Sequence, residues 1–304
     1  MDRVTIALGG NALLRRGEED TFEEMYRNAR GAAERIADIA ANGWEVVVTH
    51  GNGPQVGNEL LRQERAADEV PPLPLYLAVA QTQAEIGALI ESELGAVAGR
   101  PVVCLLTHVR VDEDDPAFKA PTKPVGPFYA EEEARQLEAD RGWIVAGDAG
   151  RGWRRVVPSP APLEVVELEA VRTLVGAGAI AVACGGGGIP VSSRNGRLAG
   201  LDAVIDKDRA SALLAIALAA ERLVILTDVD AVYAGWGTDE REQLRELDAN
   251  AARALLPELA EGSIGPKVEA SLAFAQGTGR EALITSAAAL GDALAGRAGT
   301  RIKS

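Results

Sequence analysis

The sequence has few cysteines, few aromatic residues and no long apolar run. Its two cysteines, Cys104 and Cys184, both fall inside apolar, strand-like segments. They are therefore predicted to be buried free thiols in a reducing cytoplasm, not a disulfide or a metal site. No run of 18 apolar residues is present and the N-terminus has no apolar signal segment, so we expect neither a membrane span nor secretion.

Basic residues are also few relative to acidic ones. The 304-residue chain has 31 lysines and arginines against 45 aspartates and glutamates, so its net charge is −14 at pH 7. A nucleic-acid-binding protein normally carries a basic face, so this balance argues against that class. Only five of the 31 basic residues are lysines: Lys119, Lys123, Lys207, Lys267 and Lys303. An ammonium is a compact charge that a planar guanidinium does not always replace. Lys303, in the C-terminal tail, is expected to be incidental. Each of the other four lysines is thus a candidate ligand contact, with chance placement as the alternative.

Short apolar segments alternate with helical patterns along most of the chain. Strands are predicted at 3–8, 44–49, 101–106, 179–184, 223–227 and 282–285. Helices are predicted at 21–42, 77–94, 163–175, 210–220, 249–256 and 268–275. One more helix is predicted after the segment HGNGPQVG, ending at about residue 64. This alternation is typical of a parallel sheet covered by helices on both faces. The interval 107–162, rich in proline, glycine and charge, predicts an inserted subdomain or lid.

Glycine-rich segments follow three of the predicted strands, after Leu8, after Thr49 and after Cys184. In a parallel sheet these positions share the edge where ligands bind. The third segment has four consecutive glycines at 185–188, for which a tight structural turn is the alternative. No GxxxxGK[ST] motif is present and GNGPQVG does not fit GxGxxG, which argues against a P-loop enzyme and a dinucleotide-binding oxidoreductase.

Two lysines stand where a helix is predicted to begin. Lys207 lies in the first turn of an alanine-rich helix, and Lys267 follows Pro266. A cation there costs about 0.3–1 kcal/mol at an exposed site, and a bound polyanion would reverse the sign. Solvated surface lysines are the alternative. Asp206 and Asp208, which flank Lys207, can cap the helix, hold a lysine or help to organise a metal.

A nucleoside triphosphate with Mg²⁺ fits these parts, because phosphoryl transfer needs alignment and charge neutralisation more than a protein nucleophile. Asp228 and Asp230 end another predicted strand and either contact the nucleotide or cap the loop. His50 either contacts ligand or packs, and His108 is expected to be structural.

Eight segments together resemble the carbamate kinases, which have the amino-acid kinase fold. They are ALGGNALL, THGNGPQVGNELL, FKAPTKPVGPFY, DAGRGWRRVVPSP, ACGGGGIPV, DAVIDKDRASALLA, ILTDVDAVY and GSIGPKVEA. The resemblance extends from about residue 4 to residue 285. The third and fourth segments are the most specific to carbamate kinases. Related kinases of the fold usually have a lysine in the first strand, which VTIALGG lacks.

The resemblance implies a single domain, 1–304, folded as a three-layer αβα sandwich with an open, mainly parallel central sheet. It implies a substrate lobe at about 1–178, with the lid at about 108–162, and a nucleotide lobe at about 179–304. It also implies a cytoplasmic homodimer that binds neither nucleic acid nor membrane. The reaction implied is ATP + carbamate = ADP + carbamoyl phosphate with Mg²⁺, used to make ATP in arginine catabolism. No protein ligand of the metal is predicted.

The resemblance also assigns site residues. Lys123 and Lys207 would bind the transferring phosphoryl group, Asp208 would position these two lysines, and Lys267 would neutralise the nucleotide phosphates. The carbamoyl phosphate side would comprise Gly9, Gly10, Asn11, Gly51, Asn52 and Gly53. The nucleotide side would comprise Gly185, Gly186, Gly187, Gly188, Asp228 and Tyr233, with the four glycines letting the backbone approach phosphate. The role of the loop at 234–243 stays open.

Two other functions remain as alternatives. One is another small-acid kinase on the same fold, against which the lid motifs and the lysine-free first strand argue. The other is a catalytically silent nucleotide sensor, which would be expected to lack one of the motif lysines or aspartates. Lys123, Lys207, Asp208 and Lys267 are all present.

Overall fold

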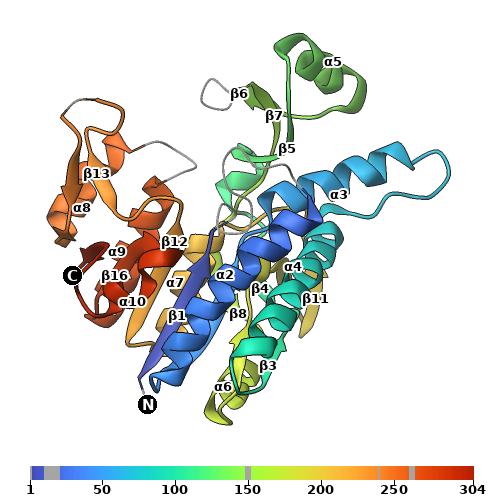
Figure 1. Cartoon of the computed structure of the whole chain (residues 1–304). Helices are drawn as coiled ribbons and strands as arrows, with labels where there is room; N and C mark the ends of the chain where they lie inside the picture. Colours follow the sequence, from blue (N-terminus) through green and yellow to red (C-terminus); the bar gives the residue numbers. More distant parts are fainter. Residues whose placement is uncertain (1, 10–20, 148–151, 239, 260–263) are drawn as a thin grey trace.

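The computed structural model describes residues 2–9, 21–147, 152–238, 240–259 and 264–304. Within these ranges the central sheet has the strand order β15-β17-β16-β12-β1-β2-β9-β3 (Figure 1). All its ladders are parallel except that between β16 and β17. The strands are β1 (Arg3–Leu8), β2 (Glu45–His50), β3 (Val102–Cys104), β9 (Ile180–Val182), β12 (Arg222–Thr227), β15 (Glu246–Leu247), β16 (Ala282–Ser286) and β17 (Thr300–Ile302).

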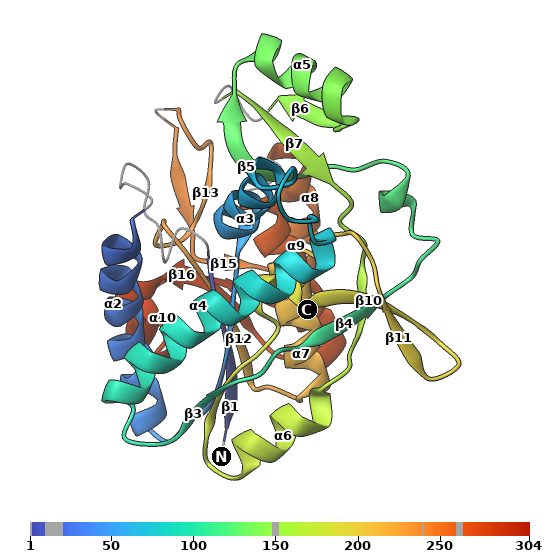
Figure 2. The same cartoon turned by 90° about the vertical axis from the view of Figure 1, so that its right-hand side faces the viewer.

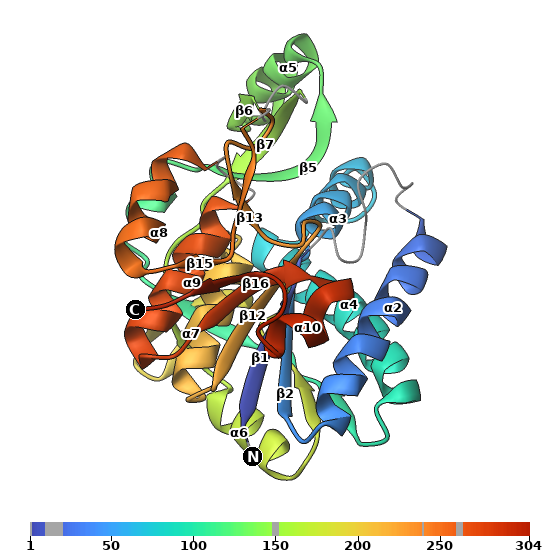
Figure 3. The same ribbon diagram turned by 60° about the vertical axis from the view of Figure 1, so that its left-hand side comes forward.

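Helices cover both faces of this sheet, as Figure 3 shows. Alternate residues of β1 point to opposite faces: Ile6 packs in the core beneath α2 (Phe22–Ala41) and α4 (Leu75–Val97), whereas Ala7 packs in the core beneath α7 (Lys207–Ala217) and α9 (Gly265–Thr278). The remaining α-helices of the described chain are α3 (Gly53–Arg65), α5 (Glu131–Arg141), α6 (Leu168–Gly176), α8 (Ala249–Leu255) and α10 (Leu290–Leu294). The prediction of a three-layer αβα sandwich is confirmed.

A second sheet, of order β11-β10-β4-β8, lies beside the carboxyl end of β9. It consists of β4 (His108–Val111), β8 (Pro162–Val165), β10 (Ile189–Arg194) and β11 (Arg197–Gly200). The predicted helix at 163–175 is wrong in its first part. Residues 162–165 pair with β4 instead, and the helix starts at Leu168. Tertiary pairing outweighs the local helical pattern there.

The protruding part of the molecule is a smaller sheet with one helix, and it stands above α3 (Figure 2). It comprises β5 (Lys123–Tyr129), α5, β6 (Val145–Gly147) and β7 (Trp153–Val157), with the strand order β5-β7-β6. A hairpin of β13 (Val232–Ala234) and β14 (Glu242–Leu244) rises separately after β12. None of the helices described is both long and apolar enough to span a membrane.

Candidate active site

The candidate site lies at the carboxyl edge of the parallel strands, where three helices also begin. Gly9 is buried directly after β1, and the amide of Gly51 donates to the carbonyl of Leu8 at 3.1 Å. α3 starts just after Asn52, and α7 and α9 start at Lys207 and Gly265. The amino ends of helices carry free N–H groups and a positive dipole end. The edge is therefore suited to an anion. Gly10 and Asn11, predicted for this site, lie outside the described residues.

Three lysines from three different elements meet at the first turn of α7. Lys207 forms an ion pair with its neighbour Asp208, and Lys267 of α9 reaches the other oxygen of Asp208 at 3.1 Å. Lys123 arrives from β5 in the protruding sheet, and its Nζ lies 2.5 Å from Asp206. The side chains of Lys207, Lys267 and Asp208 are 11, 14 and 4% exposed, so this cluster is largely shielded from water.

The observed pairing differs from the expectation that Asp208 holds both Lys123 and Lys207. Asp208 holds Lys207 and Lys267, whereas Lys123 is held by Asp206. Asp206 also caps α7, accepting from the amides of Asp208 at 2.9 Å and Arg209 at 3.3 Å. The sequence did not identify Asp206 as the partner of Lys123. The IDKD spacing was a signal, but it did not tell which aspartate faces which lysine.

The electrostatics of the cluster favour an added negative charge. Burial lowers the pKa of Lys207, and the nearby Lys267 lowers it further, although Asp208 opposes both. Burial opposes ionisation of Asp208, yet its two lysines bring its pKa below the ordinary value. Asp208 is thus ionised at neutral pH. Three ammoniums beside two carboxylates and a helix amino end make a site for a polyanion.

The other two lysines stand elsewhere. Lys119 follows the short 3-10 turn at Pro116–Phe118 and is exposed. Lys303 pairs with Glu246 of β15 at 2.9 Å. Three of the five lysines therefore converge on one point of the fold.

The four glycines form a buried turn, and their missing side chains make room for the protein's own groups. A Cβ on Gly185 would lie 2.2 Å from Nε2 of His50, and one on Gly186 would lie 2.3 Å from the side-chain nitrogen of Asn52. Added Cβ atoms at Gly187 and Gly188 would meet the carbonyl of Ile205 and a methyl of Val109, each at 2.3 Å. Gly186, Gly187 and Gly188 have φ of 64°, 90° and 87°. Close packing of the two site loops therefore requires these glycines whether or not phosphate approaches them.

His50 packs within the protein at the base of this turn. The ring is fully buried, its Nδ1 lies 3.1 Å from the carbonyl of Gly51, and Nε2 has no hydrogen-bond partner. Burial lowers the pKa of His50 to about 4, so the ring is neutral. Of the two expectations for His50, packing is the one that the geometry favours. His108 pairs with Glu167 at 2.7 Å, as expected for a structural residue.

Gln83 of α4 is a functional candidate that the sequence did not indicate. Its buried amide donates to the carbonyl of Gly185 at 2.7 Å and accepts from the amide of Thr107 at 2.6 Å. It therefore ties the glycine turn to the segment that leads into β4 of the second sheet. A single glutamine within the predicted helix at 77–94 gives no sign of this role.

Asp228 and Tyr233 lie on the β12 side of the edge. Thr227 donates to Asp228 at 3.0 Å, and the Tyr233 hydroxyl donates to Asp230 at 2.8 Å. Trp236 is 61% exposed, with its ring centroid 5.5 Å from that of Tyr233. These contacts place Tyr233 in an exposed aromatic group on the hairpin and do not connect it to the lysines.

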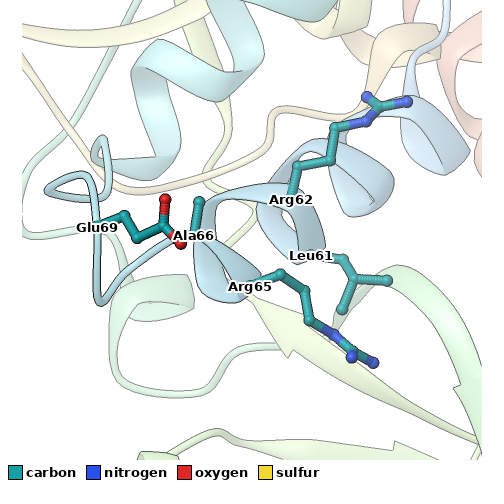
Figure 4. A pocket seen from close by; sticks show the side chains of 5 residues that line it. All are labelled: Leu61, Arg62, Arg65, Ala66 and Glu69. Carbon is teal, nitrogen blue, oxygen red and sulfur yellow. The ribbon is translucent and has the colours of Figure 1, made fainter.

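One hollow of the described surface lies away from the lysine cluster. It has a volume of about 560 Å³ and lies at the outer end of α3 (Figure 4). Its lining residues are Leu61, Arg62, Arg65, Ala66 and Glu69. It is wide open to solvent, and the chemistry-bearing side chains are at the other end of the helix.

Comparison with known proteins identifies the class. The family model described as the amino acid kinase family matches residues 2–286, so the chain belongs to that family. The carbamate kinase of Pyrococcus horikoshii is 45% identical over 310 residues, which cover 99% of each chain. The structure of carbamate kinase from Giardia lamblia bound to citric acid has a TM-score of 0.93 at 42% identity. The same enzyme bound to AMP-PNP has a TM-score of 0.90 at 42% identity. Both alignments cover 99% of this chain and 98% of the other. Within its family, the chain is therefore one of the carbamate kinases.

Proposed function

We propose that the chain transfers a phosphoryl group reversibly between ATP and carbamate, with ADP and carbamoyl phosphate as the products. The observation that carries this proposal is the convergence of Lys123, Lys207 and Lys267 on the first turn of α7. In phosphoryl transfer the protein mainly aligns donor and acceptor and neutralises the charge of the moving group. The AMP-PNP complex of the Giardia lamblia relative supports a nucleotide as one substrate.

The roles follow from position. Lys123 and Lys207 would contact the transferring phosphoryl group from the lid and from α7, and Lys267 would neutralise the nucleotide phosphates from α9. Asp208 would pair with Lys207 and Lys267 and reduce the repulsion between their charges. Asp206 would hold Lys123 in place. Gly9, Gly51, Asn52 and Gly53, together with Gly10 and Asn11, would form the carbamoyl phosphate side.

The nucleotide side would comprise the turn at 185–188 with Asp228 and Tyr233. The turn presents backbone at the edge between β9 and α7, and Asp228 ends β12. This arrangement divides the chain into a substrate lobe at about 1–178, with its lid at about 108–162, and a nucleotide lobe at about 179–304.

The divalent cation of the reaction would be Mg²⁺. No group of three or more His, Cys, Asp or Glu side chains that could hold a metal occurs among the described residues. Mg²⁺ commonly binds to substrate phosphates with one or two carboxylates and waters. The carboxylates of the lysine cluster are already paired. We therefore infer that the nucleotide phosphates would hold the ion, which would supply positive charge that neutralises the developing charge of the transferred group.

We further propose a homodimer in a reducing cytoplasm, where the free thiols of Cys104 and Cys184 would persist. Its proposed use is the formation of ATP from carbamoyl phosphate in arginine catabolism.

ATP formation from ADP, carbamoyl phosphate and Mg²⁺ tests the proposal, with acetyl phosphate as a competing donor. Rapid ATP formation from carbamoyl phosphate alone supports it. Faster turnover of acetyl phosphate would indicate another small-acid kinase. ADP binding without ATP from either donor would indicate a nucleotide sensor instead.

A further inference from the structure

The helix α3 connects the substrate loop to the protruding sheet. Asn52, directly before the helix, donates its buried side-chain amide to Thr82 at 2.9 Å and so fixes the inner end to α4. Farther along, Val56 and Leu60 of α3 share one apolar core with Val125 of β5 and Val157 of β7. The protruding sheet therefore rests on α3, as Figure 2 shows.

Backbone meets backbone where α3 crosses β5. A Cβ on Gly57 would lie 2.0 Å from both the Cα and the nitrogen of Gly126. Gly126 has φ of 78° and stands where the pairing of β5 with β7 is interrupted. The strand therefore has no room to move toward the helix, and any side chain at position 57 must push it away. Lys123 begins this same strand, three residues before Gly126.

A second contact fixes the outer end of the helix. Glu64 forms ion pairs with Arg141 of α5 at 2.7 Å and with Arg155 of β7 at 3.0 Å. Both guanidiniums also lie over the ring of Trp143, at 5.6 and 5.0 Å from its centroid. The Glu64 side chain is only 19% exposed, so both pairs are partly shielded from solvent.

We propose that Gly57 and Glu64 are positioning residues for Lys123. The Gly57–Gly126 contact sets the distance between β5 and α3, and the ion pairs of Glu64 set the orientation of the protruding sheet relative to α3. Together they determine whether the Lys123 ammonium reaches the first turn of α7. The proposal rests on the role of Lys123 in the proposed function. A displacement of about 1 Å at a reacting group can lower the rate about 100-fold.

Gly57→Ala tests the backbone contact, with Gly31→Ala as the matched control. Gly31 lies within α2 and has nothing within 4 Å of an added Cβ. We expect Gly57→Ala to lower kcat for ATP formation at least tenfold, while the Kd for ADP and the fraction of molecules that bind ADP stay within twofold. The control keeps all three values. An unchanged kcat in a folded Gly57→Ala protein would overturn the proposal.

Glu64→Gln tests the second contact and keeps the experiment decisive if Gly57→Ala fails to fold. Its control is Glu59→Gln, because Glu59 is also on α3 but, among the described residues, bonds to Arg62 and Gln63 of the same helix and not to the protruding sheet. We expect a several-fold lower kcat with an unchanged KM for ADP for Glu64→Gln only. Equal kcat values for the two variants would contradict the role of Glu64.

Amine labelling with acetic anhydride provides a readout that does not depend on the substrate. Mass spectrometry of the labelled protein should find Lys123 more reactive in Gly57→Ala and in Glu64→Gln than in the wild type, because its ion pair with Asp206 is weakened. If the wild type makes no ATP from carbamoyl phosphate, the proposed function fails, while this labelling difference still tests the positioning. Equal labelling of Lys123 in all variants would refute the positioning.

Discussion

At the scale of single residues, Asp206 combines two tasks that substitution can separate. Its Oδ1 accepts from two amides at the start of α7, and its Oδ2 pairs with Lys123. Burial opposes its ionisation, but Lys123 and Lys207 bring the pKa of Asp206 far below the ordinary range. An asparagine caps a helix about as well as an aspartate, but it carries no charge for the lysine.

Asp206→Asn is therefore expected to keep most of the stability and to lose Lys123 positioning. We expect turnover to fall about tenfold or more, in keeping with the loss of a charge-assisted hydrogen bond. ADP affinity should change little. Asp248→Asn is the control, because Asp248 caps α8 in the same way without a lysine partner among its described contacts. Steady-state kinetics with ADP titration measures both values, and equal turnover in the two variants would refute the role of Asp206.

His50 predicts a particular dependence of stability on pH. Its pKa is about 4 in the folded chain and about 6.5 when unfolded, so between these values the unfolded chain binds more protons. The free energy of unfolding should therefore fall as pH is lowered from about 6.5 to about 4, by about 3 kcal/mol from this group. Asp206 and Asp208, whose pKa values are lowered, lose their contributions only below their ordinary pKa of 3.8.

Urea unfolding at several pH values, compared between wild type and His50→Gln, measures this effect. The slope between pH 6.5 and 4 should flatten in the variant, whatever its absolute stability. A slope that is the same in both proteins would show that His50 is not buried in its neutral form.

At the scale of elements, the glycine turn joins the two halves of the site through its packing. Gly186→Ala must adopt φ of 64° and also displace the side chain of Asn52. We expect a loss of about 2 kcal/mol or more in the free energy of unfolding, together with a loss of turnover. Gly178→Ala is the control, since Gly178 has φ of 88° but nothing within 4 Å of an added Cβ.

Chemical denaturation of both variants separates the cost of the left-handed backbone conformation from the cost of displacing Asn52. The control should lose only the cost of the left-handed conformation, and Gly186→Ala should lose more. If Gly186→Ala loses turnover but is no less stable than Gly178→Ala, the contact with Asn52 is not what requires the glycine, and phosphate approach becomes the better explanation.

Much of the architecture was predictable because its signals are local. The apolar segment at 3–8 matches β1 residue for residue, and the glycine turns stand at strand ends as expected. The predicted helix at 163–175 failed because pairing with β4 is a contact between distant segments. The Lys123–Asp206 pair joins residues 83 apart in the sequence, and the Gln83 bridge connects three segments. Spacing along one chain does not specify such distant pairs, so the pairing of Lys207 with its neighbour Asp208 was predictable but that of Lys123 with Asp206 was not.

At the scale of the whole molecule, we expect the chain to form a homodimer. Light scattering of the purified protein at micromolar concentration should give twice the mass of one chain. A monomer at that concentration would contradict the predicted assembly.

The central claim is that a lysine carried by the protruding sheet completes the phosphoryl-transfer site of the body. The most direct test compares Lys123→Arg with the wild type in ATP formation from ADP and carbamoyl phosphate, with ADP binding measured by calorimetry on the same samples. Because a broad guanidinium does not replace a compact ammonium at a transferring phosphoryl group, turnover should fall about 100-fold or more while ADP binding persists. Near-normal turnover in Lys123→Arg would contradict the account.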